Sequence, residues 1–194
     1  MDTFDSACLF LLEYRESSSK LTVSSPNLAL SSSSRWSRPR VGGPKLNTDA
    51  AFPARESFIG CGGVIRDEHG SVLVCWPIRV VGCFNVEVAE LIATREGLRL
   101  AVEFGCPLAE IETDSLLVVH SISSPQLCST VGLLVRDISL LFSSTDYGSR
   151  RHVSRNRNMV AHKLASFAII SSSDKIWGDA CLYFISKFLI VDLQ

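Results

Sequence analysis

Three acidic residues, Asp49, Glu90 and Asp114, stand at positions where packing alone does not explain a carboxylate. Asp49 lies at the centre of a predicted strand (46–52), Glu90 in a predicted helix (86–104), and Asp114 directly after a predicted strand (109–113). If the three side chains meet, they repel and raise one another's pKa, and a divalent cation relieves that repulsion. All-oxygen ligands suit Mg²⁺ or Mn²⁺, and carboxylates that hold two ions about 3.5–4 Å apart are typical of nucleases.

Two of these acids also have a purely structural interpretation. Glu90 could be a first-turn acid that the helix dipole favours, and Asp114 could be the N-cap of the helix that follows it. One further pattern favours a role for Glu90. It leads a helix face whose other members are mostly small, namely Ala93, Thr94, Gly97 and Ala101. Small residues allow a close approach, so this face would hold Glu90 near the element on which the helix packs.

The remaining pattern predicts the elements that position the acids. Three strands (46–52, 57–66 and 71–81) form an antiparallel meander, followed by the helix 86–104 and the strand 109–113. Helices at 115–122 and 131–142, a strand at 147–154 and a helix at 159–170 complete an α/β domain. The helix after the third strand implies a crossover, which places the fourth strand parallel to the first. Asp49 and Asp114 would then face each other across that pair.

Composition limits the class of protein. The chain has 194 residues, of which 46% are hydrophobic, so it has room for one well-packed domain plus extensions. A formal net charge of -1 excludes a globally basic nucleic-acid binder but not a local basic patch. The seven cysteines contain no CxxC pair, which argues against a zinc site or a disulfide framework and favours reduced thiols in an intracellular protein. We expect the nucleus, the cytoplasm or an organelle as its compartment.

Three regions are predicted along the chain. Residues 1–44 are expected to be a disordered, Ser-rich, basic arm, because positions 17–37 contain ten serines and few residues able to build a core. A transit peptide is the alternative, although the four acids among the first 16 residues are unusual for one. Residues 45–172 form the domain. Residues 173–194 form a tail that packs on the domain or is loosely ordered, and its apolar run (180–191) is too short to span a bilayer.

Five segments in order carry a resemblance to a known family. They are NTDAAF (47–52), GGVIRDEHG (62–70), AELIATREGL (89–98), IETDS (111–115) and RNRNMVAHKLA (155–165). Together they resemble the ribonuclease H superfamily, in particular the plant ribonuclease H-like domains of reverse-transcriptase-derived genes. The resemblance implies a five-stranded mixed sheet in the order 3-2-1-4-5, flanked by helices. It also implies that Asp49, Glu90 and Asp114 bind two Mg²⁺ or Mn²⁺ ions, and that the RNA strand of an RNA–DNA hybrid is cut to leave a 3′-hydroxyl and a 5′-phosphate.

The fourth position of the site departs from the best-known enzymes, which carry Asp where this chain has His162. The plant group resembles this chain in having His there. A neutral imidazole binds a metal or a water through nitrogen but adds no negative charge, so we expect a more weakly held second ion. The structural alternative is a polar side chain tolerated near the start of the last helix.

A basic cluster supplies the second functional indication. Between positions 150 and 163 the chain has cations and no acid, and the predicted nucleic-acid contacts are Arg150, Arg151, Arg155, Arg157 and Asn158. Such cations would hold phosphates without reading sequence; the alternative is an ordinary solvated charge run. Asn85 would contact a ribose 2′-hydroxyl or cap the helix. The expected partner is an RNA–DNA hybrid or RNA, bound by a monomer that does not enter a membrane. The alternative function is a non-catalytic nucleic-acid-binding module, a domesticated retroelement remnant.

Overall fold

The computed structural model describes residues 35–39, 43–53, 57–124, 131–144, 148–171, 174–178 and 183–193. The strands are β1 (Lys45–Ala51), β2 (Phe58–Arg66), β3 (Val72–Val81), β4 (Glu110–Thr113), β5 (Ser149–His152) and β6 (Trp177–Gly178). The helices are α2 (Val86–Glu103), α3 (Leu116–Ser123), α4 (Gly132–Ser143), the 3-10 helix η2 (Arg155–Asn158), α5 (Met159–Ile170) and α6 (Tyr183–Leu193). Each predicted element is present, with boundaries within about three residues of those expected.

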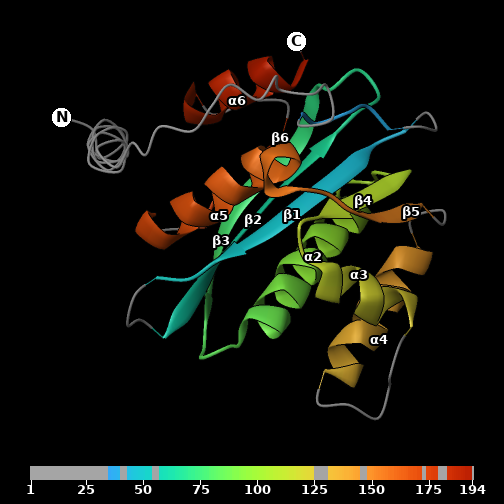
Figure 1. The fold of residues 1–194 in the computed structure, drawn as a ribbon, viewed down its shortest axis with the longest axis vertical. Helices are drawn as coiled ribbons and strands as arrows, with labels where there is room; N and C mark the ends of the chain where they lie inside the picture. Colours follow the sequence, from blue (N-terminus) through green and yellow to red (C-terminus); the bar gives the residue numbers. More distant parts are fainter. Residues whose placement is uncertain are drawn as a thin grey trace, which may run out of the picture. The chain divides into compact units, whose positions relative to one another are not determined.

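The sheet has the order β5-β4-β1-β2-β3-β6. β1, β2 and β3 pair antiparallel, whereas β4 is parallel to both β1 and β5. The predicted order 3-2-1-4-5 is therefore confirmed, and the predicted crossover places β4 beside β1. The expectation of five strands is corrected by one: β6, from the tail, adds to the free edge of β3. Figure 1 shows α5 and α6 on one side of this sheet and α2, α3 and α4 on the other.

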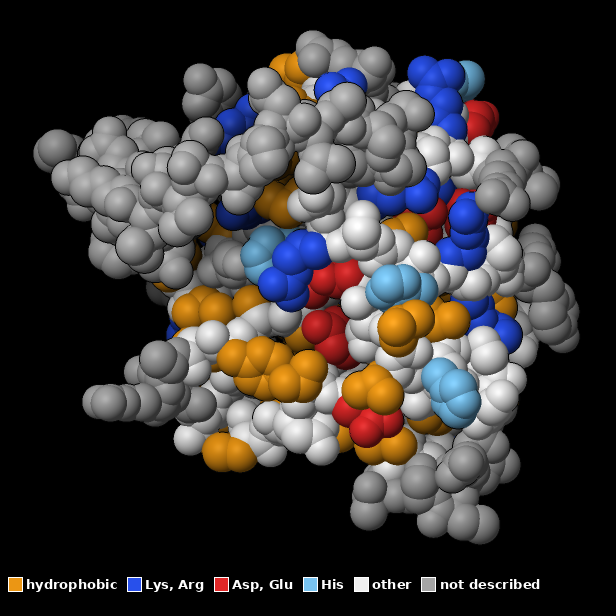
Figure 2. Space-filling model, in the orientation of Figure 1, with side chains coloured by type: hydrophobic (Ala, Val, Ile, Leu, Met, Phe, Trp, Pro, Cys, Tyr) orange, Lys and Arg blue, Asp and Glu red, His pale blue; other side chains and the backbone are white. Residues whose placement is uncertain are grey.

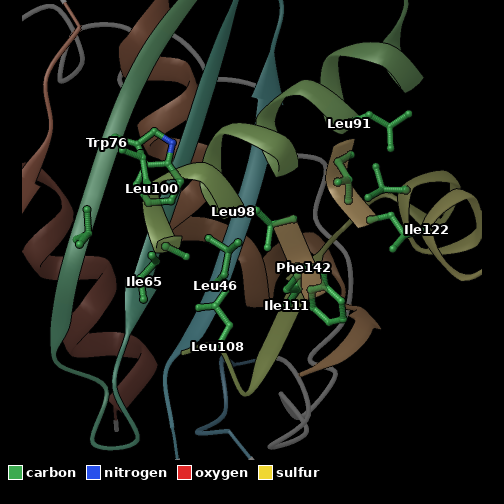
Figure 3. Close-up of a cluster of buried hydrophobic side chains, with 14 of the residues drawn as sticks. Leu46, Ile65, Trp76, Leu91, Leu98, Leu100, Leu108, Ile111, Ile122 and Phe142 are labelled. Atoms are coloured by element: carbon green, nitrogen blue, oxygen red, sulfur yellow. The ribbon is translucent and has the colours of Figure 1, made fainter. Parts of the chain in front are cut away.

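Alternation along the strands divides the core between the two faces. Ile65 of β2 lies in the cluster beneath α2 and α4, whereas its neighbour Val64 lies in the cluster beneath α5 and α6. Figure 3 shows the first cluster, in which Leu98 of α2 lies near Leu46 and Leu100 lies near Trp76. The burial of these apolar side chains is the main driving force for the fold. It holds α2 against β1, the strand that carries Asp49.

Glycines in β2 allow α5 to lie directly on the sheet. A Cβ atom at Gly62 would be 2.0 Å from the backbone nitrogen of Ala165, and one at Gly60 would be 2.3 Å from the Ala165 carbonyl oxygen. Close approach of the α5 backbone is therefore the reason for these glycines. Because His162 lies on α5, this approach also sets how near its ring comes to β1.

Gly62→Ala is expected to displace α5 and to lower the free energy of unfolding by about 3 kcal/mol, near the upper end for overpacking, because backbone atoms of α5 cannot move independently. Urea unfolding measures the effect. Gly178→Ala is the matched control, since its Cβ would meet only the Leu73 carbonyl oxygen, at 3.7 Å. Equal losses in the two variants would contradict the close approach of α5.

The compact unit extends beyond the predicted domain at both ends. It begins at Arg35 rather than at residue 45. Trp36 is 4% exposed, and its indole N–H donates to Asn47 Oδ1 at 3.0 Å. The first part of the predicted arm, residues 1–34, lies outside the described residues.

At the other end of the compact unit, Ile185 and Leu189 of α6 pack with Val64, Val160 and Leu164, so this part of the tail is docked. Leu182 and the side chains of Tyr183 and Phe184 lie outside what the structure describes. Among the described helices, none has the length and apolar character needed to cross a bilayer.

Candidate active site

The three predicted acids lie where the parallel pairing of β1 with β4 ends. Thr48 pairs with Thr113 in the parallel ladder, so the next residues, Asp49 and Asp114, leave the pair at the same level. The small-residue face of α2 lies on β1, where a Cβ at Gly97 would be 2.9 Å from Thr48 Cγ2. That close approach brings Glu90 to the end of β1, and its carboxylate accepts a hydrogen bond from the Ala50 backbone.

Asp49 and Glu90 are buried acids. Asp49 is 0% exposed and Glu90 is 7% exposed. Burial, followed by the charges of Asp49 and Asp114, raises the pKa of Glu90 to about 9. Burial also raises the pKa of Asp49. The hydrogen bond from His162 lowers this pKa, and the charge of Asp114 raises it further. The charge of Asp114 thus reaches both Asp49 and Glu90, which agrees with three carboxylates that lie near one another.

Structural alternatives for these acids do not apply. The N-cap of α3 is Ser115, whose side chain accepts from Val118 N, so Asp114 is not the cap. The acid in the first turn of α2 is Glu87, and Glu90 lies beyond it on the buried face. For Asn85 the structural alternative holds: its side chain caps α2 by accepting from Val88 N at 2.9 Å. Contact of Asn85 with a ribose hydroxyl stays a prediction.

His162 lies at the site, on the α5 side of β1. Its Nδ1 is 2.7 Å from Asp49 Oδ2, and its side chain is 25% exposed. The fourth position of the predicted constellation thus contacts the first directly. When Asp49 is ionised, its oxygen accepts from Nδ1–H, which leaves Nε2 as the nitrogen with a lone pair.

Asp114 is held by two other side chains. Arg155 Nε lies 3.1 Å from Asp114 Oδ2, and Asn158 Nδ2 donates to Asp114 Oδ1 at 2.9 Å. Asn158 Nδ2 also donates to the Thr48 carbonyl at 2.8 Å, and its Oδ1 accepts from Asn47 Nδ2 at 3.3 Å. Since Asn158 is 1% exposed, it is not placed for the nucleic-acid contact predicted for it. It positions Asp114 against β1 instead.

The Asn47–Asn158 link was not predicted from the sequence. One signal for it is available: Asn47 and Asp49 are two residues apart in a strand, so they share a face. A polar residue on the same face as a buried acid needs partners, and Asn158 of η2 is one of those that Asn47 finds. The sequence does not show that this partner is Asn158, because that depends on where η2 lies relative to β1.

The other predicted arginines lie on β5 and η2. Arg150 lies 4.4 Å from the Phe142 ring centroid, Arg151 Nη1 lies 4.0 Å from Glu110 Oε1, and Arg157 donates to Ser37 Oγ. Among the predicted arginines, Arg155 is the one with a described contact to one of the three acids. On the face in Figure 2, acidic side chains are visible at the centre, beside Lys or Arg and near two His side chains.

The donor set suits a hard divalent ion. Within the described part of the chain, no three acidic, His or Cys side chains already form a metal-ligand cluster. Arg155, Asn158 and His162 occupy three of the carboxylate oxygens. Asp49 Oδ1 and Glu90 Oε2, however, are buried and have no hydrogen-bond partner among the described residues. Buried, unpartnered carboxylate oxygens are costly, and they are the ligands that Mg²⁺ and Mn²⁺ prefer.

Without divalent ions, stability is expected to fall as pH rises from about 5 to 9. The unfolded chain loses the Glu90 proton near the ordinary glutamate pKa of 4.5, whereas the folded state keeps it until about 9. The stabilisation from the buried neutral acid is therefore complete below the unfolded pKa and lost as pH approaches the folded pKa. The slope is at most about 1.4 kcal/mol per pH unit for this group. Urea unfolding in EDTA at pH 5, 7 and 9 measures it.

Glu90→Gln should flatten this pH dependence, because the amide does not titrate. Glu87→Gln, at an acid in the first turn of the same helix, is the control and should keep the wild-type profile. Parallel profiles for the wild type and Glu90→Gln would show that Glu90 is ionised in the folded protein.

Comparison with known proteins agrees with this geometry. The family model described as reverse transcriptase-like matches residues 47–168. An Arabidopsis thaliana protein that is named as a ribonuclease H protein is 33% identical to this chain over 135 residues. That match covers 69% of this chain but only 22% of the Arabidopsis protein.

Solved structures share the fold. The N-terminal ribonuclease H domain of rv2228c from Mycobacterium tuberculosis is 25% identical with a TM-score of 0.58, covering 67% of this chain and 95% of that one. LC11-RNase H1, isolated from compost and solved with an RNA/DNA hybrid, is 23% identical with a TM-score of 0.57, covering 66% of this chain and 96% of that one. The chain therefore belongs to the reverse transcriptase-like family and has the ribonuclease H-like fold.

Proposed function

We propose that the domain is a divalent-metal-dependent endonuclease that cuts the RNA strand of RNA–DNA hybrids. The observation that carries the proposal is the convergence of Asp49, Glu90 and Asp114, with two buried carboxylate oxygens that have no partner among the described residues. The hybrid bound to LC11-RNase H1, which has the same fold, supports this substrate class. The Arabidopsis relative supports the same activity.

Each side chain has a role in this proposal. Asp49, Glu90 and Asp114 would hold Mg²⁺ or Mn²⁺, which in such sites activates the attacking water and stabilises the leaving oxygen. An ionised Asp49 would accept from His162 Nδ1–H and leave Nε2 to hold a proton or orient a water. Asn158 fixes the direction of the Asp114 carboxylate. Arg150, Arg151 and Arg155 bind phosphates through charge, without reading the bases.

A specific observation favours a second candidate function, a non-catalytic nucleic-acid-binding module. Two of the three acids already have partners from this chain, Asp49 with His162 and Asp114 with Arg155. A protein that had lost its metal would retain such contacts and its basic side chains. This module would bind hybrids or RNA in a salt-sensitive way, would lose affinity on Arg155→Ala or Arg157→Ala, and would not cut.

The test is a cleavage assay on end-labelled RNA–DNA hybrid, duplex RNA and duplex DNA, in Mg²⁺, Mn²⁺ or EDTA. We expect the RNA strand of the hybrid alone to be cut, only with a metal, and to leave 3′-hydroxyl and 5′-phosphate ends. Salt-sensitive binding of the hybrid without any cutting would overturn the nuclease proposal and favour the binding module.

A further inference from the structure

Arg155 is the cation that faces the carboxylate site. Besides its 3.1 Å contact with Asp114, its charge lowers the pKa of both Asp49 and Glu90. The pairing is asymmetric in exposure: the Arg155 side chain is 61% exposed, whereas that of Asp114 is 10% exposed. The guanidinium thus reaches the site from solvent, and the carboxylate belongs to the protein interior.

The two partners of Asp114 are anchored very differently. Asn158 is buried and is tied to the Thr48 carbonyl and to Asn47, so its hydrogen bond to Asp114 Oδ1 is part of the packed structure. Arg155 is the first residue of η2, and its side chain reaches out of that turn to Asp114 Oδ2. An exposed ion pair of this kind contributes little to stability. Arg155 can therefore leave Asp114 while Asn158 keeps the carboxylate in place.

A divalent ion bound at Asp114 would repel the Arg155 guanidinium, because both are cations and both would lie beside the same carboxylate. A divalent ion that takes Oδ2 displaces the guanidinium and leaves it free at the rim of the site. The planar fork of an Arg side chain suits phosphate oxygens as well as carboxylate oxygens. In nucleic acid bound at these carboxylates, the backbone phosphates are the anions within reach of the released side chain.

We propose that Arg155 is an exchangeable counter-ion, which pairs with Asp114 while the site is free of metal and moves to a backbone phosphate of the nucleic acid when a divalent ion takes Asp114. This inference rests on the proposed metal site and adds a coupling to it. Metal binding releases the cation that nucleic acid needs, so each ligand strengthens the other, and by linkage the factor is the same in both directions.

The coupling gives Arg155→Ala two effects of opposite sign. Without the competing guanidinium, Mn²⁺ should bind about two- to fivefold more tightly, the range expected for loss of an exposed ion pair. Without the phosphate contact, nucleic acid should bind several-fold more weakly in Mn²⁺, with a salt slope smaller by about one. If Arg155 only held phosphate, Arg155→Ala would weaken nucleic-acid binding and leave the Mn²⁺ affinity unchanged.

The experiment measures both affinities without catalysis. Mn²⁺ binding to the free protein is measured by titration calorimetry, and binding of a hybrid whose RNA strand is 2′-O-methylated, and so resists cleavage, by fluorescence anisotropy with Mn²⁺ or EDTA. Arg150→Ala is the matched control, because Arg150 lies against Phe142 and not on an acid. It should weaken hybrid binding and leave the Mn²⁺ affinity unchanged. Arg155→Lys should retain part of both wild-type values, because the charge is kept.

The outcomes separate this inference from the proposed nuclease activity. If wild-type protein binds Mn²⁺ but cuts nothing, the nuclease proposal fails, and tighter Mn²⁺ binding by Arg155→Ala still supports the exchange. If Arg155→Ala binds Mn²⁺ no more tightly than wild type, or if neither protein binds it, the exchange is overturned. It is also overturned if the hybrid affinity of the wild type is the same in Mn²⁺ and in EDTA.

Discussion

Asp49→Asn is expected to abolish metal-dependent hybrid cleavage, with a loss of about a thousandfold or more, while the protein stays folded. Asp49 is 0% exposed and is the acid that contacts His162 and faces Asp114. An amide keeps the shape and still accepts from His162 Nδ1, but it removes the charge that would hold a divalent ion. Loss of such a ligand forfeits several kcal/mol of transition-state stabilisation, and each 1.36 kcal/mol is about tenfold in rate.

Stability separates this loss from unfolding. Because burial raises the pKa of Asp49, the ionised carboxylate is disfavoured in the folded protein without metal. Asp49→Asn should therefore leave the free energy of unfolding in EDTA unchanged or higher. Asp137→Asn is the control, since Asp137 lies on α4 with its side chain 57% exposed. It should keep wild-type cleavage. If cleavage survives Asp49→Asn, the activity comes from another site or from a contaminant.

The convergence of the three acids is the part of the site that a sequence can predict. A crossover helix requires β4 to be parallel to β1, and the acids follow the paired residues Thr48 and Thr113. The small residues of α2 predict close packing on β1, which carries Glu90 with it. These are consequences of strand and helix periodicity, so they follow from local patterns once the strand order is known.

The partners of the acids were not predictable in the same way. Asp114 pairs with Arg155 and Asn158, more than forty positions further along the chain, and no periodicity connects them.

Composition also gave a wrong expectation at the N-terminal end of the domain. The serines around Trp36 suggest disorder, yet the buried indole donates to Asn47, and Ser37 accepts from Lys45 and Arg157, so this segment lies against the domain. Average composition does not register a single tertiary contact of this kind.

The largest stability effect is expected from Asp192→Ala, in the last turn of α6. Asp192 Oδ2 accepts from Arg66 Nη1 at 2.8 Å, and the Arg66 side chain is 1% exposed. Burial lowers the pKa of Arg66 and raises that of Asp192, so desolvation of the pair outweighs its attraction. The intact pair therefore adds little stability. Removing one partner leaves a buried, uncompensated charge, and we expect a loss of about 3–5 kcal/mol.

That loss would be a large share of the total stability of an ordinary domain, roughly 5–15 kcal/mol, and urea unfolding measures it. Asp192→Asn should lose less, because the amide oxygen still accepts from Arg66. The double variant Asp192→Leu with Arg66→Met should recover most of the stability, since apolar side chains can replace a buried pair. A loss below about 1 kcal/mol for Asp192→Ala would show that Arg66 is solvated once its partner is gone.

The same pair also supports the carboxylate site from a distance. Arg66 Nη2 donates to Asn47 Oδ1 at 3.3 Å, and Asn47 Nδ2 donates to Asn158, which holds Asp114. Asp192 lies beyond residues 47–168, the part that matches the family model. A protein truncated after Ile170 keeps all four predicted site residues but leaves Arg66 without Asp192. We expect it to lose more stability than Asp192→Ala does, because Ile185 and Leu189 are removed as well, and to bind Mn²⁺ more weakly because Asp114 is less firmly held.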